Sequence, residues 1–69
     1  MKLSARNKLP GRVVSITRGE ATANVNVDVA GMTMTAAITV AAVDELGLVE
    51  GSEVTVVVKA SDVMLAVAD

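Results

Sequence analysis

The clearest pattern along the chain is a strict alternation of apolar and polar residues in its middle third. From residue 21 to 29 the odd positions are Ala or Val and the even positions are Thr, Asn or Asp. From residue 32 to 40, Met, Ala, Ile and Val recur at every second position, mostly with Thr between them. A period of two is typical of a strand with one buried face, so the two runs predict an antiparallel hairpin that turns at Ala30-Gly31.

Three further strands are expected around this hairpin. Residues 11–18 are rich in Val, Ile, Ser and Thr and are followed by a Gly-containing turn, which indicates a first strand. Residues 52–59 place Val at every second position and predict a fourth strand. Residues 63–68 predict a fifth, and this one is apolar on both faces. A strand of that kind should be covered on both faces, and in so small a domain a second subunit is the simplest cover.

A short helix is expected between the third and fourth strands. Residues 40–46 lose the alternation, Gly47 suits a left-handed C-cap, and Thr39 is a candidate N-cap. The element order therefore predicts one all-β domain over residues 1–69, a five-stranded OB-like Greek-key barrel with one short helix between strands 3 and 4. Other small barrels remain open at this point.

Composition adds that the domain is expected to assemble. The chain has 69 residues, of which 52% are hydrophobic and none is aromatic, and it has no Cys. A domain of this size buries only about 60% of the surface that its unfolded chain exposes. Without disulfides, oligomerisation is the expected source of extra stability. An unusually apolar monomer is the alternative.

Several classes of function are disfavoured. With neither His nor Cys, the chain lacks the commonest general base and metal ligands, and its Ser residues lie in no recognised catalytic motif, so we expect no enzyme. A net charge of −2 and the absence of aromatic residues argue against nucleic acid. No signal peptide and no membrane-spanning segment are recognisable, so we expect a cytoplasmic protein without a membrane partner.

Two short segments are rich in hydrogen-bond donors. Ser4-Ala5-Arg6-Asn7-Lys8 precedes the first strand, and Lys59-Ala60-Ser61-Asp62 follows the fourth. A tetrahedral oxyanion offers only acceptors, so hydroxyls, backbone N–H groups and cations suit it, provided that the Asp62 carboxylate points away. A solvated tail and a turn cap are the plainer interpretations of the two segments.

Four segments together resemble the molbindins, single Mop domains that bind molybdate and tungstate. They are Ser4-Ala5-Arg6-Asn7-Lys8-Leu9, Ala36-Ala37-Ile38-Thr39, Glu45-Leu46-Gly47-Leu48 with Glu50-Gly51, and Val58-Lys59-Ala60-Ser61-Asp62-Val63. They span nearly the whole chain in matching order. The resemblance implies an OB-like barrel and a homohexamer, a trimer of dimers, with oxyanions at subunit interfaces.

The resemblance also implies a set of site residues. The donor positions map onto Ser4, Ala5, Arg6, Lys59, Ala60 and Ser61, and Thr39 is expected to come from a neighbouring subunit. Ala42 stands where related domains can carry Ser, so only its backbone N–H could contribute. The metal would be bound only as its oxyanion, with no separate cofactor and no side-chain metal ligand.

The function that follows is storage or buffering of molybdate, or tungstate, in the cytoplasm. Two alternatives stay open. One is a molybdate-sensing regulatory or interaction module, and the other is a structural oligomer without a ligand.

Overall fold

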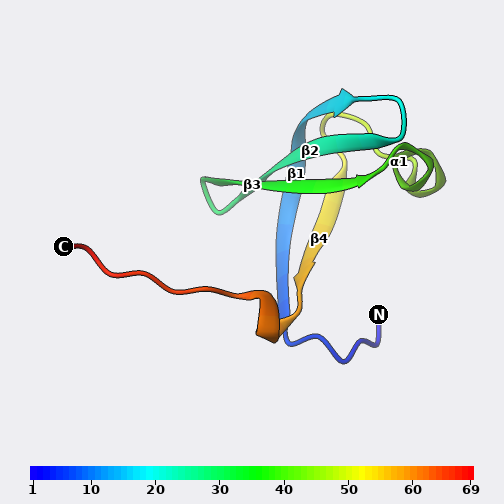
Figure 1. The fold of residues 1–69 in the computed structure, drawn as a ribbon. Helices are drawn as coiled ribbons and strands as arrows, with labels where there is room; N and C mark the ends of the chain where they lie inside the picture. Colours follow the sequence, from blue (N-terminus) through cyan, green and yellow to red (C-terminus); the bar gives the residue numbers. More distant parts are fainter.

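Four antiparallel strands and one short helix make up the computed structural model, which describes residues 1–69. The order along the chain is β1 (Asn7–Arg18), β2 (Thr22–Val29), β3 (Met32–Thr39), α1 (Val40–Leu46), β4 (Glu53–Val58) and a one-turn 3-10 helix, η1 (Ala60–Asp62). The strands form a single sheet in the order β3-β2-β1-β4 (Figure 1). The first four predicted strands and the helix between strands 3 and 4 are thus confirmed. None of the helices has the length and apolar character needed to cross a bilayer.

The predicted hairpin is formed by β2 and β3. Val29 pairs with Met32, which leaves Ala30 and Gly31 as a two-residue loop. Both loop residues have positive φ, at 51° and 85°. Positive φ at both positions gives the loop the twist that matches its flanking strands, and Gly31 adopts it without a steric penalty.

The core lies on one face of the sheet. Val13 of β1 and Ala23, Val25 and Val27 of β2 are buried there, and Val43 of α1 is fully covered against them. The alternation therefore has its expected consequence, because the Asn and Asp residues of β2 point to the opposite, polar face. Both ends of α1, which carries Val43, are capped. Thr39 accepts a hydrogen bond from the Ala42 N–H, and Gly47 is left-handed with φ 63°.

β1 begins four residues earlier than its sequence pattern predicts. Residues 7–12 pair with the whole of β4, from Asn7 opposite Val58 to Arg12 opposite Glu53. Pro10 breaks the expected pattern of a central strand. The structure accommodates it because β1 pairs with β2 only from Arg12 onward, so at Pro10 the strand has β4 as its only neighbour.

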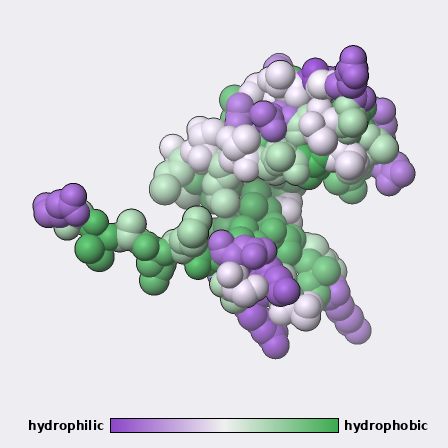
Figure 2. All heavy atoms as spheres, in the orientation of Figure 1, coloured by the Kyte–Doolittle hydropathy of each residue, from purple (hydrophilic) through white to green (hydrophobic).

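The fifth strand predicted over residues 63–68 does not form within the chain. Residues 63–69, here called the C-terminal arm, have no strand partner and extend away from the sheet (Figure 1). No other part of the chain covers the large apolar side chains of this arm. Met64, Leu65 and Val67 are 92%, 94% and 91% exposed. Figure 2 shows the arm as an apolar projection that ends in a polar tip.

An apolar groove lies between the two edges of the sheet. β3 and β4 are the two edges of the sheet, and their residues line common hollows. Met34, Ala36 and Ile38 contribute from β3, and Val54 and Val56 contribute from β4. We call this groove the β3–β4 seam. One chain therefore carries both an unpaired apolar segment and an unfilled apolar groove.

Gly11 of β1 lies close to β2 and gives a prediction about stability. A Cβ at this position would lie 2.6 Å from Val27 Cγ1 and 2.9 Å from the Asp28 carbonyl oxygen. Because part of this clash is with backbone, we expect Gly11→Ala to lower the free energy of unfolding by about 1–3 kcal/mol. Urea unfolding at one fixed protein concentration measures the change.

The control for this variant is Asn24→Ala, at an exposed position of β2. It should stay within about 0.5 kcal/mol of the parent protein. Equal urea midpoints for Gly11→Ala and the parent protein would show that the two strands can separate at this point without cost.

Candidate oxyanion-binding site

The two donor-rich segments lie side by side at one end of the sheet. Because β1 and β4 are antiparallel and Asn7 pairs with Val58, the residues just before β1 must adjoin the residues just after β4. Six predicted site residues line one hollow there, together with Val57 and Asp62: Ser4, Ala5, Arg6, Lys59, Ala60 and Ser61. Two segments more than fifty positions apart in the sequence thus form one surface feature.

The polar side chains of this hollow have no partner in the chain. Ser4, Arg6, Lys59 and Ser61 are exposed, and none of them takes part in a side-chain hydrogen bond or an ion pair. They offer two hydroxyls, a guanidinium and an ammonium. Their donors are therefore available to a ligand that only accepts hydrogen bonds.

The turn after β4 adds backbone donors. η1 is closed by two hydrogen bonds, from the Asp62 N–H to the Lys59 carbonyl at 2.9 Å and from the Val63 N–H to the Ala60 carbonyl at 3.3 Å. The N–H groups of Ala60 and Ser61 are not used in these bonds, as expected for the first residues of a helical turn. Ala60 can therefore contribute through its backbone although its side chain carries no polar group.

Asp62 lies in the same hollow, so its carboxylate is the one unfavourable group for an anion. The hollow is lined by two positively charged side chains, Arg6 and Lys59, and by one negatively charged side chain, Asp62. The expectation that Asp62 points away from the ion stays a prediction, and it is tested below by removing the charge.

The other two predicted site residues do not reach this hollow within one chain. Thr39 and Ala42 lie at the start of α1, which is at the opposite end of β4 from η1 (Figure 1). The Ala42 N–H donates to Thr39 Oγ1 at 3.0 Å, so it is already engaged in the helix cap. The Thr39 hydroxyl accepts in this bond, and its own proton remains free to donate.

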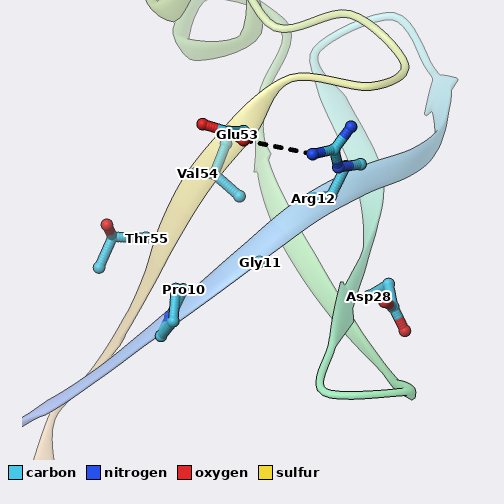
Figure 3. Close-up of a pocket in the computed structure, with 7 residues that line it drawn as sticks. All are labelled: Pro10, Gly11, Arg12, Asp28, Glu53, Val54 and Thr55. Atoms are coloured by element: carbon cyan, nitrogen blue, oxygen red, sulfur yellow. Dashed lines mark hydrogen bonds and ion pairs between the residues drawn. The ribbon is translucent and has the colours of Figure 1, made fainter.

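A second polar hollow on the sheet was not found from the sequence. It is lined by the seven residues labelled in Figure 3, and at its centre Arg12 Nη2 lies 3.2 Å from Glu53 Oε1. The strand register puts Asp28 on the other side of Arg12. The sequence did not reveal this group of Arg12, Asp28 and Glu53, because the three residues lie on three different strands. Only the pairing of β1 with β2 and with β4 brings them together.

The chemistry of the second hollow is less suited to an anion. Its single cation is already paired with one carboxylate and is flanked by another. No group of three or more His, Cys, Asp or Glu side chains is placed to hold a metal ion. The hollow between the donor-rich segments is thus the better candidate for an oxyanion.

Comparisons with known proteins agree on one family. The TOBE domain family matches residues 3–65. Molybdenum-pterin-binding protein 2 of Clostridium pasteurianum is 47% identical over 66 residues, which covers 94% of this chain and 97% of that protein.

Two solved structures share the fold over almost the whole chain. A molybdate-binding protein from Sporomusa ovata is 41% identical with a TM-score of 0.92, covering 96% of this chain and 98% of that one. The cytoplasmic molybdate-binding protein ModG, solved with molybdate bound, is 42% identical with a TM-score of 0.93. The match covers 99% of this chain and 49% of ModG, so this chain corresponds to about half of that protein.

Proposed function

This chain belongs to the TOBE domain family, and we propose that it binds molybdate as an intact oxyanion in the hollow between Ser4–Arg6 and Lys59–Ser61. The observation that carries the proposal is the convergence of these two segments. Each segment taken alone has a plainer interpretation, but together they offer unpaired donors at one point. The similarity to proteins named for molybdate and molybdenum-pterin binding supports the same ligand.

The chemistry of the hollow suits an ion that is fully deprotonated at neutral pH. Ser4 and Ser61 can donate through hydroxyls, Ala60 and Ser61 through backbone N–H groups, and Lys59 through its ammonium. Hydrogen bonds from these groups to the ion are charge-assisted and are about twice as strong as neutral ones. Tungstate has the same shape and charge and is expected to bind as well. Phosphate keeps a P–OH proton that a donor-only site cannot accept.

The site is proposed to be completed by a second copy of the chain. The hollow opens to the surface, and neither Thr39 nor Ala42 of the same chain lines it. Thr39, whose hydroxyl proton is free, lies too far along the sheet to reach the hollow of its own chain. We propose that Thr39 of a second subunit closes the site, while the engaged Ala42 N–H contributes only if the helix cap opens.

The C-terminal arm supports assembly independently of the ligand. In a second copy the arm would find the β3–β4 seam, whose apolar lining suits the apolar residues that the arm exposes. Two chains that exchange arms in this way would each gain the predicted fifth strand, and the exchange is two-fold symmetric. A homohexamer built as a trimer of such dimers is the assembly that we propose.

The role that follows is storage or buffering of molybdate, with no bond made or broken. Isothermal calorimetry of the purified protein with molybdate, tungstate and sulfate tests it. We expect molybdate and tungstate to bind, and the smaller sulfate ion to bind more weakly than either. No heat with molybdate, from a protein that light scattering shows to be assembled, would instead indicate a structural oligomer without a ligand.

Removing the carboxylate of Asp62 should strengthen molybdate binding. Two charges about 7 Å apart in water interact by roughly 0.6 kcal/mol per pair of unit charges, and salt reduces this value. We therefore expect Asp62→Asn to tighten binding about two- to tenfold at low salt, with a smaller gain at high salt. Calorimetry at two salt concentrations measures both effects.

Asp28→Asn is the matched control, because it removes the same charge from the other polar hollow. It should change the affinity less than about twofold. If Asp62→Asn instead weakened binding, Asp62 would be a support of the turn that holds Ser61, and its charge would not be what limits affinity.

A further inference from the structure

We infer that the bound oxyanion fastens the C-terminal arm, so that occupancy of the site controls how readily subunits exchange. This inference rests on the proposed function, since it assumes that the ion binds between Ser4–Arg6 and Lys59–Ser61. The inference goes beyond the proposed function because it gives the ion a second role. The bound ion would also hold in place the turn from which the exchanged arm begins.

The site and the arm share η1. Lys59, Ala60 and Ser61 line the hollow, and the arm begins at Val63, two residues after Ser61. Any rotation of η1 that swings the arm must also move three of the proposed donors. The arm and the site therefore share the backbone of η1, so a change in this turn would affect both.

Little else in the chain holds this turn. η1 has only the two backbone hydrogen bonds given above, no side-chain cap and no buried residue. The opposing segment, Ser4–Arg6, lies outside any strand, and only Ala5 in it is half-buried. A turn with so few contacts is expected to open at low free-energy cost.

The charges that line the hollow suit a divalent anion that connects the two segments. Arg6 and Lys59 line it together, and Asp62 is the only carboxylate among the lining residues. A divalent anion would offset the repulsion between the two cations and would connect both loose segments. If the ion is lost when η1 rotates, linkage requires that the ion in turn stabilises the docked arm.

The expected consequence is that the oligomer dissociates more slowly when the oxyanion is bound. When loaded, the arms stay in the seams of their partners and the subunits remain together. When empty, the arms leave more often and chains redistribute between particles. At a free ion concentration about 100 times the dissociation constant, one site that requires the docked arm should slow arm release by about 10- to 100-fold.

Subunit exchange measured by fluorescence energy transfer tests this inference. The chain has no Cys, so Glu20→Cys, at an exposed turn outside the hollow, can be labelled at a single position. Particles that carry donor dye are mixed with particles that carry acceptor dye, with molybdate or with sodium chloride at equal ionic strength. We expect exchange to be at least tenfold slower with molybdate.

Two further variants locate the effect. Ser61→Ala removes a hydroxyl donor next to the arm and should reduce the slowing at a given molybdate concentration. Thr17→Ala, at an exposed position of β1 outside both this hollow and the β3–β4 seam, should show the same slowing as the parent protein. An equal response of both variants would overturn the role of η1.

Amide hydrogen exchange provides a second readout, which does not require chains to leave the particle. In the assembled protein, molybdate should increase protection of the amides of residues 60–68 at least tenfold, while those of the β2–β3 hairpin stay within about twofold. Calorimetry on the same samples separates the two proposals. Binding without slower exchange and without arm protection overturns the fastening alone, whereas no binding overturns the proposed function and the fastening together.

Discussion

Leu65→Asp should convert the assembled protein into monomers. Leu65 is 94% exposed in the single chain, so the change costs almost nothing in an isolated monomer. In the proposed assembly the same residue lies in an apolar seam, where burial of Leu contributes about 1.5–3 kcal/mol and an unpaired carboxylate costs more. Because two arms are exchanged in each pair of chains, the change counts twice. We expect pairing to weaken at least a thousandfold, as measured by light scattering over a range of concentrations.

Asn24→Asp is the matched control for this prediction. It adds the same charge, in a nearly isosteric change, at an exposed position on the polar face of β2. The control should assemble like the parent protein. If Leu65→Asp also did so, the arm would not be the element that joins the subunits, and the β3–β4 seam would need another occupant.

Lys59→Ala should weaken molybdate binding about 10- to 100-fold and leave the assembly intact. The ammonium is exposed and has no partner in the chain, so its loss removes a donor and a positive charge without disturbing packing. A hydrogen bond to a charged partner is worth about 1.5–3 kcal/mol, which corresponds to that range of affinities. Calorimetry gives the affinity, and light scattering checks the assembly.

Lys8→Ala is the control for the charge itself. Lys8 is exposed on β1 and is not among the residues that line the hollow. We expect it to change the affinity less than about threefold at physiological salt. Wild-type affinity in Lys59→Ala would count against the assigned site, even if the protein bound molybdate elsewhere.

These two predictions address different surfaces of the molecule. Leu65 lies in the arm and Lys59 lies at its root, so one tests the assembly and the other tests the ligand. If fastening by the ion is correct, Lys59→Ala should also make assembly less sensitive to molybdate. The result for either variant is interpretable without the other.

The local features of the fold could be predicted from the order of the residues. The alternation in residues 21–29 and 32–40 predicted which face of β2 and β3 is buried, and Ala30-Gly31 predicted the turn between them. Thr39 and Gly47 predicted the ends of α1. Each of these features depends on residues a few positions apart, so side-chain periodicity and backbone preference are enough to specify it.

The way in which distant segments meet could not be predicted and is seen only in the folded chain. The pairing of Asn7 with Val58 brought the two donor segments to one hollow. The pairing of β1 with β2 and with β4 placed Asp28 and Glu53 on either side of Arg12. The sequence pattern predicted a fifth strand over residues 63–68, and in the single chain this strand does not form. The physical reason is that alternation specifies which face of a strand is buried, whereas the neighbour that satisfies its backbone N–H and C=O groups is set by non-local geometry.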